Sequence, residues 1–224
     1  MNGQRIIEID NVNFGEALRY LGYGNNKPDE QTEKMLSKCA KELKANMEGK
    51  FIYKVFPIAD GMVEGTNFEL KGNSIKKHLE NCEKAVFMCA TLSGGVDSLI
   101  RKKQIVSMAE AMVTDSLASA VIEQVCDKAE EIILKDFKEY EHTWRFGLGY
   151  GDFPLEFNKR IAILLDIPRK IGVTITPNNL LIPQKSMLGL IGIGSDKRKK
   201  SCGNCVMKED CPFRKRGQRC YRTD

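Results

Sequence analysis

The order of sequence patterns along the chain predicts an α+β fold. Short β-like runs come first, a long stretch with helical periodicity follows, and the last part of the body mixes both patterns. A chain that builds an α/β fold would instead alternate strands and helices regularly. The charge and cysteine content change near residue 195, so we expect a folded body over residues 1–194 and a separate tail over residues 195–224.

The first predicted elements are a helix and the strands that follow it. Residues 28–48 open with Pro28 and Asp29, end before Gly49, and carry apolar side chains at helical spacing at Met35, Leu36, Cys39, Leu43 and Met47. Runs typical of strands cover residues 51–58, 67–70 and 85–92, with turn-rich segments between the first two. We expect these runs to pair in a sheet.

The central part of the chain predicts long helices. No glycine or proline occurs between Gly95 and Gly147, and apolar residues recur with the helical period of 3.6. This stretch predicts two helices. Beyond it, the pattern predicts a helix over residues 155–165 and strands over residues 172–176 and 187–193.

Composition and charge exclude several classes of protein. The 224 residues are 42% hydrophobic, which is enough to bury a core, yet no apolar run approaches the roughly 18 residues of a membrane span. No signal-peptide pattern is present, so we expect a cytoplasmic protein without a membrane partner. The tail carries ten Lys or Arg against four Asp or Glu, and the body 25 against 26. General nucleic-acid binding needs a broader basic face, so no nucleic-acid partner is expected.

The segment Ser93-Gly94-Gly95-Val96-Asp97-Ser98 follows directly after an apolar run. Such a Ser/Gly-rich turn resembles the PP-loop of ATP pyrophosphatases, whose backbone N–H groups cradle phosphate at a helix N-terminus. That family needs further parallel strand and helix units after the loop, and the remaining chain lacks regular alternation of this kind. The alternative is a tight turn in which Asp97 or Ser98 caps the following helix.

A second motif, Arg145-Phe146-Gly147-Leu148-Gly149-Tyr150, follows the predicted helices. Its glycines allow the backbone to approach a ligand, Arg145 can bind a carboxylate with two hydrogen bonds, and Tyr150 offers an aromatic face. These groups suit a ligand that combines an amino acid with a nucleoside. A glycine-rich turn with an anchoring arginine and a packed tyrosine is also common in loops without a ligand.

The same motif resembles the Arg-x-x-x-Gly-Tyr signature of the activation domain of cobalamin-dependent methionine synthase. Other segments agree with that family in order and spacing: residues 16–23 are similar to the start of stand-alone, clostridial-type members, and residues 90–97, 115–123 and 183–189 to later segments of the domain. The resemblance covers most of residues 14–194. It implies a C-shaped α+β domain with a twisted antiparallel sheet and long central helices.

The resemblance also implies a function. The family binds S-adenosyl-L-methionine (AdoMet) and supports reductive methylation of cob(II)alamin, which reactivates a methionine synthase. The chain would then be an AdoMet-dependent methyltransferase component acting in methionine biosynthesis. Its partners would be a cobalamin-binding methionine synthase or other corrinoid protein, which carries the cobalamin, and an electron donor of the flavodoxin or ferredoxin type.

Site residues follow from the resemblance position by position. Arg145 would bind the AdoMet carboxylate, Gly149 would let the backbone approach, and Tyr150 would lie beside the methyl group in the catalytic position. Glu123 would bind the α-amino group, or would be a solvated helix carboxylate. Asp152 falls where the family makes a backbone contact to the adenine, although the local residues differ here. The two histidines, His78 and His142, are predicted to be solvated.

The eight cysteines fall into two groups. Cys39, Cys82, Cys89 and Cys126 lie in apolar segments and are expected to act as small core residues. The tail places Cys202, Cys205, Cys211 and Cys220 in the spacing C-x2-C-x5-C-x8-C, which predicts a metal site. Its first part resembles accessory 4Fe–4S motifs of radical AdoMet enzymes, so an iron–sulfur cluster is favoured, with Zn²⁺ or chance clustering as alternatives. Two further functions stay open: a PP-loop enzyme with a cluster, of the tRNA-thiolating type, and a non-catalytic zinc-binding adaptor.

Overall fold

A computed structural model describes residues 5–24, 26–194, 209–215 and 217. Its centre is an antiparallel sheet built on three long strands, β2 (Gly49–Ala59), β5 (Cys82–Thr91) and β10 (Ser186–Gly194). β5 lies between the other two and runs antiparallel to both. The predicted α+β fold class is confirmed.

Shorter strands extend the sheet on both sides. The order is β4-β3-β2-β5-β10-β6, with β1 added to β2 and β7 added to β10. Their bounds are β1 (Arg5–Ile7), β3 (Met62–Val63), β4 (Phe68–Glu69), β6 (Glu141–His142) and β7 (Phe146–Gly147). A separate two-stranded sheet pairs β8 (Thr174–Ile175) with β9 (Leu181–Ile182).

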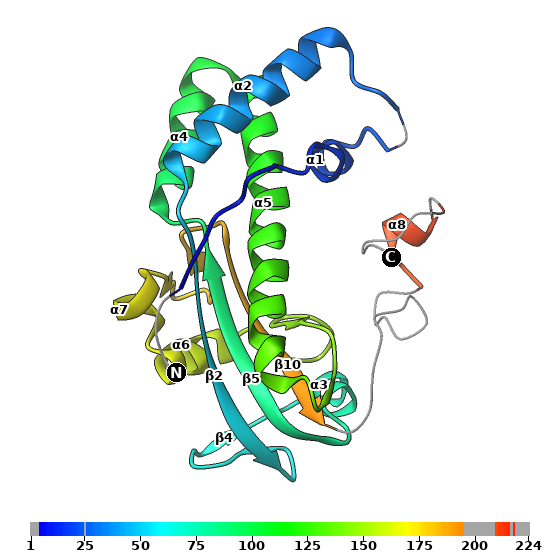
Figure 1. Ribbon diagram of the computed structural model, residues 1–224, viewed down its shortest axis with the longest axis vertical. Coiled ribbons are helices and arrows are strands. Elements are labelled where there is room, and N and C mark those ends of the chain that lie inside the picture. The colour runs from blue at the N-terminus through cyan, green and yellow to red at the C-terminus, as the bar shows by residue number, and fades with distance from the viewer. Residues whose placement is uncertain (1–4, 25, 195–208, 216, 218–224) are drawn as a thin grey trace.

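Helices cover both faces of the sheet (Figure 1). On one side lie α1 (Phe14–Tyr20), α2 (Glu30–Asn46), α4 (Gly94–Val106) and α5 (Met108–Leu134), which ends in a short 3-10 turn, η1 (Lys135–Phe137). On the other side lie α6 (Phe157–Leu165) and α7 (Ile167–Ile171), and buried residues of α3 (Asn73–His78) share their apolar core. The short helix α8 (Pro212–Lys215) belongs to the tail.

The fully apolar run in β5 reflects burial on both sides. Val86, Met88 and Ala90 pack into the core beneath α5, whereas Phe87 and Cys89 pack into the core beneath α6. Successive side chains of a strand point to opposite faces, so a strand covered on both faces has no solvent-facing positions. This accounts for the absence of polar alternation between residues 85 and 92.

The predicted helices at residues 28–48 and in the central region are confirmed, with one change of extent. The Asp29 side chain caps α2 by accepting a hydrogen bond from the Thr32 N–H at 2.7 Å. Ser107 is extended and separates α4 from α5, where its hydroxyl accepts from the Glu110 N–H. The helical pattern stops at Leu134, and β6 and β7 occupy part of the remaining glycine-free stretch.

The segment from Ser93 to Ser98 is a tight connection between β5 and α4. A Cβ atom on Gly95 would lie 2.2 Å from the Asn46 carbonyl oxygen, so this glycine is required where α4 meets the end of α2. Neither Asp97 nor Ser98 caps the helix, contrary to the expectation: the Asp97 carboxylate accepts from the Gln184 N–H, and the Ser98 hydroxyl donates to the Gly94 carbonyl. Because β5 has antiparallel neighbours, the parallel sheet of a PP-loop enzyme is not formed.

His78 corrects a second expectation, because it is buried and not solvated. Only 3% of the residue is exposed, its Nε2 lies 2.7 Å from the Thr143 hydroxyl, and its ring packs against Trp144 and Phe146. The Thr143 hydroxyl also accepts from the Gly192 N–H, which ties α3 to β10 through a polar bridge. His142 is half-buried.

Three of the four cysteines of the body are fully buried, as expected for core residues: Cys39, Cys89 and Cys126. Cys82 is half-buried. In the tail, Cys211 is half-buried next to α8, and Cys202, Cys205 and Cys220 lie outside the described residues. Among the helices that the structure describes, none combines the length and apolar character needed to cross a bilayer.

Candidate functional site

A row of carboxylates occupies one side of α5. Glu123, Asp127 and Glu130 follow one another at spacings of four and three residues, which places them on one face of the helix. The helix runs along the sheet beside β10 (Figure 1). The three carboxylates lie on the side of α5 that contacts the segment before β7, which pairs with β10.

The sheet edge presents Arg145. This residue immediately precedes β7, whose residues Phe146 and Gly147 pair with Leu190 and Gly189 of β10. Its Nη1 donates to Glu130 Oε2 at 2.8 Å, and its Nη2 donates to Glu123 Oε2 at 2.9 Å and to Asp127 Oδ1 at 3.1 Å. One guanidinium thus joins the sheet edge to three carboxylates of α5.

The two ends of the guanidinium differ in their access to solvent. The side chains of Arg145 and Glu130 are 13% and 20% exposed, whereas those of Glu123 and Asp127 are 49% and 62% exposed. Burial raises the pKa of Glu130, an effect that Arg145 opposes and Asp127 supports. The cluster therefore has a buried Nη1 end and an open Nη2 end, and its acidic groups outnumber its single cation.

Next to Arg145, the turn after β7 brings the backbone to the surface. Gly149 has a φ of +83°, a conformation that favours glycine. A Cβ atom on Gly147 would lie 2.8 Å from the Tyr150 ring, so this ring lies directly against the Gly147 backbone. Tyr150 is 66% exposed. The turn therefore offers an aromatic face to solvent beside the arginine.

The carboxylate of Asp152 is used locally. It accepts hydrogen bonds from the Asn73 N–H at 2.6 Å and the Ser74 N–H at 2.8 Å, at the start of α3. These hydrogen bonds, that from Ser74 first, lower the pKa of Asp152. The Asp152 side chain thus fixes the turn to α3.

A second tyrosine lies near the carboxylate row. Tyr20, at the end of α1, is partly buried, and its burial together with the nearby Glu16 and Glu123 raises its pKa to about 12. The Arg19 guanidinium lies 4.6 Å from the centre of the Tyr20 ring. Helix α1 therefore borders the same part of α5 as the open end of the Arg145 cluster.

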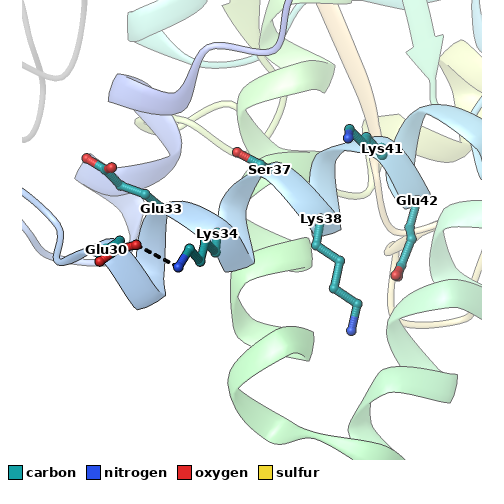
Figure 2. A pocket seen from close by; sticks show the side chains of 7 residues that line it. All are labelled: Glu30, Glu33, Lys34, Ser37, Lys38, Lys41 and Glu42. Atoms are coloured by element: carbon teal, nitrogen blue, oxygen red, sulfur yellow. Dashed lines mark ion pairs between the residues drawn. The ribbon is translucent and has the colours of Figure 1, made fainter.

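Surface hollows occur elsewhere on the molecule. One of about 640 Å³ lies along α2, lined by side chains of that single helix: Glu30, Glu33, Lys34, Ser37, Lys38, Lys41 and Glu42 (Figure 2). Figure 2 shows these charged side chains spread along the helix surface, with Glu30 paired to Lys34. This hollow is an open groove between solvated side chains, and it lacks the mixture of groups seen around Arg145.

Comparison with known proteins identifies the fold. No protein-family profile matches the sequence, and no curated protein matches it. Among solved structures, the chain is similar to "Crystal Structure of the MetH Reactivation Domain bound to AdoHcy", with a TM-score of 0.62 and 13% sequence identity. The match covers 96% of this chain and 86% of that one. The chain has the fold of the MetH reactivation domain.

Within this MetH-like fold, the residues predicted from the sequence are partly brought together. Glu123 and Arg145 are in direct contact, and Gly149 and Tyr150 follow Arg145 in the adjoining turn. Asp127 and Glu130, which complete the cluster, were not predicted from the sequence. Their spacing from Glu123 on a predicted helix was the available signal, but only the fold places Arg145 opposite that face.

Proposed function

We propose that the protein binds AdoMet at the Arg145 cluster and supports reductive methylation of cob(II)alamin carried by a partner. The observation that carries the proposal is the contact of Arg145 with Glu123 at the open end of a charged cluster, in a chain with the MetH reactivation fold. This pairing offers both charges that the amino-acid end of AdoMet requires. The partner would be a cobalamin-binding methionine synthase or a related corrinoid protein.

Each predicted residue has a role in this proposal. Arg145 binds the ligand's carboxylate, and Glu123 binds its α-ammonium. Gly149 lets the backbone come close, and Tyr150 lies beside the methyl group that is transferred. Asp152 contributes its backbone to the adenine, since its carboxylate caps α3.

The chemistry divides between the partners. AdoMet carries its methyl group on a positively charged sulfonium. A nucleophile that attacks this methyl carbon breaks the S–C bond, and the neutral thioether AdoHcy is the leaving group. One electron from a flavodoxin- or ferredoxin-type donor reduces the partner's cob(II)alamin to cob(I)alamin, which takes the methyl group and leaves AdoHcy. The chain's own contribution as a methyltransferase component is to hold the methyl group over the cobalt, because orientation removes much of the entropic barrier.

The test is to mix the protein with cob(II)alamin-loaded methionine synthase that lacks its own activation domain, together with AdoMet and a reductant. Methylcobalamin is expected, measured from its absorbance spectrum. Arg145→Ala is expected to weaken AdoMet binding by about 2 to 4 kcal/mol, because the ligand's carboxylate loses its charge-assisted partner. Absence of methylcobalamin with the parent protein, or equal AdoMet affinity in the variant, would contradict the proposal.

A second proposal concerns the tail. We propose that residues 195–224 form a distinct basic unit in which Cys202, Cys205, Cys211 and Cys220 ligate one iron–sulfur cluster, as in a stand-alone reactivation protein with its own electron relay. Thiolate-ligated clusters reach reduction potentials down to roughly −700 mV, whereas Zn²⁺ has no redox chemistry. The ten basic residues of the tail would attract an acidic electron donor.

Anaerobic reconstitution, metal analysis and paramagnetic resonance of the reduced protein test this assignment. A cluster signal lost in Cys205→Ser is expected. Stoichiometric zinc without a cluster signal would make the tail a structural zinc site and leave the AdoMet proposal intact. Saturable ATP binding, measured in parallel with AdoMet binding, would instead favour the PP-loop alternative.

A further inference from the structure

The open end of the Arg145 cluster is shared by two competing carboxylates. Arg145 Nη2 donates to both Glu123 and Asp127, at 2.9 and 3.1 Å, whereas Nη1 donates to Glu130 alone among the described residues. A ligand carboxylate that approaches the same guanidinium from solvent has to reach Nη2. One of the two carboxylates must therefore give up its place.

The geometry singles out Asp127 for displacement. Its contact with Arg145 is the longest of the three, and its side chain is the most exposed, at 62%. Ion pairs of such exposed groups are weak, because water solvates both partners when they separate. Glu130 is held at the buried end, where a charge left without its partner costs much more.

We infer that Asp127 occupies the place of the ligand's carboxylate in the unliganded protein, and that binding exchanges one carboxylate for the other on Arg145 Nη2. The exchange conserves the charge next to Arg145. Glu130 keeps the guanidinium in position throughout, and the released Asp127 turns into solvent. This inference rests on the proposed function. Asp127 competes with the carboxylate of a ligand for Arg145 Nη2, and it does not compete with a ligand that lacks a carboxylate.

Two ligands separate this competition from the other charge effects. AdoMet and decarboxylated AdoMet share the ammonium, the sulfonium and the adenosine, and they differ in the carboxylate. Replacing Asp127 with Asn keeps the size of the side chain but removes its charge. Asp127 attracts the cationic groups that both ligands share, and this attraction cancels when the two affinities are divided. The ratio of the affinity for AdoMet to that for decarboxylated AdoMet therefore reports the exchange of carboxylates on Arg145.

The experiment measures both affinities by calorimetry in the parent, in Asp127→Asn and in Glu131→Gln. Glu131 is an exposed carboxylate of α5, and it takes no part in the hydrogen bonds of the Arg145 cluster. Glu131→Gln changes the net charge by the same amount as Asp127→Asn, so it is the matched control. The preference for AdoMet over decarboxylated AdoMet is expected to rise about two- to five-fold in Asp127→Asn, the range for a half-exposed ion pair. It is expected to stay unchanged in Glu131→Gln.

The outcomes are distinguishable. An unchanged ratio in Asp127→Asn, with both ligands bound by the parent, overturns the exchange and leaves the AdoMet site standing. An equal rise in Glu131→Gln also overturns it, since the effect is then one of general charge. A parent protein that binds neither ligand overturns the proposed function and the exchange together.

Discussion

Arg145 Nη1 and Glu130 Oε2 lie 2.8 Å apart, although the first residue belongs to the edge of the sheet and the second to α5. Both side chains are largely shielded from solvent. This pair fixes the direction of the guanidinium, and the other end of the arginine faces the surface as a consequence.

Glu130→Gln is expected to weaken AdoMet binding by about 0.5 to 1.5 kcal/mol, because a neutral partner holds the guanidinium less firmly than a carboxylate does. Calorimetry checks this value. Glu131→Gln provides the control, since that side chain is exposed on the same helix. Equal affinities in the parent and Glu130→Gln would show that the pair does not orient the arginine for binding.

The pH dependence of stability gives an independent measure of Glu130. Burial raises its pKa in the folded protein, so the native state binds this proton more tightly than the unfolded state does. The free energy of unfolding of the parent, relative to Glu130→Gln, should therefore fall as pH rises from about 4.3, the ordinary value for Glu, through the raised pKa. Urea unfolding at several pH values measures the difference. A difference that grows with pH would contradict the expected direction.

Asp152→Asn is expected to destabilise the protein at neutral pH without changing its affinity for AdoMet. The Asp152 carboxylate accepts from the N–H groups of Asn73 and Ser74, and its pKa is lowered mainly by the hydrogen bond from Ser74. A lowered pKa contributes stability that is lost on acidification, so the variant and the parent should converge as pH falls below about 4. Urea midpoints test the first expectation and calorimetry the second. A large loss of affinity would assign the side chain to the ligand.

The two neighbouring glycines before α4 should respond differently to alanine. Beyond its chain neighbours and the backbone of its own helix, a Cβ atom on Gly94 would meet no atom within 4 Å, whereas on Gly95 it would lie 2.2 Å from the Asn46 carbonyl oxygen. Gly94→Ala should change the unfolding free energy by less than about 1 kcal/mol, and Gly95→Ala should lower it by about 2 kcal/mol or more through backbone displacement. Thermal and urea unfolding compare the pair. Similar effects of both variants would contradict a packing role for Gly95.

Lys103 ties three helices together at one end of the molecule. Its Nζ lies 2.5 Å from Glu42 of α2 and 2.7 Å from Glu110 of α5, and 8% of its side chain is exposed. Lys103→Met should lower the unfolding free energy by about 1 to 3 kcal/mol, less than for a fully buried pair because Glu42 is 37% exposed. Lys102→Met, at an exposed position of the same helix, is the matched control. Equal effects of the two variants would refute the bridging role.

The sequence predicted the elements whose pattern is local. The apolar spacing from Met35 to Met47 and the capping Asp29 located α2, and the uninterrupted apolar run from residue 85 located β5. His78 was misjudged because burial of a polar ring depends on a distant partner, here Thr143, 65 residues away. Asp127 and Glu130 were missed for the same reason. The sequence around α5 does not show that these carboxylates pair with Arg145, which lies beside the sheet edge.

The double-sided packing of β5 has a consequence for how the molecule opens. Its side chains contribute to both apolar cores, and its backbone is bonded to β2 on one side and β10 on the other. Neither helical layer can detach completely without exposing one face of this strand, so the two layers share one cooperative unit. Amide hydrogens from Ala85 to Ala90 should accordingly exchange with deuterium only through global unfolding, and those of α7 and the β8–β9 hairpin through smaller, local openings.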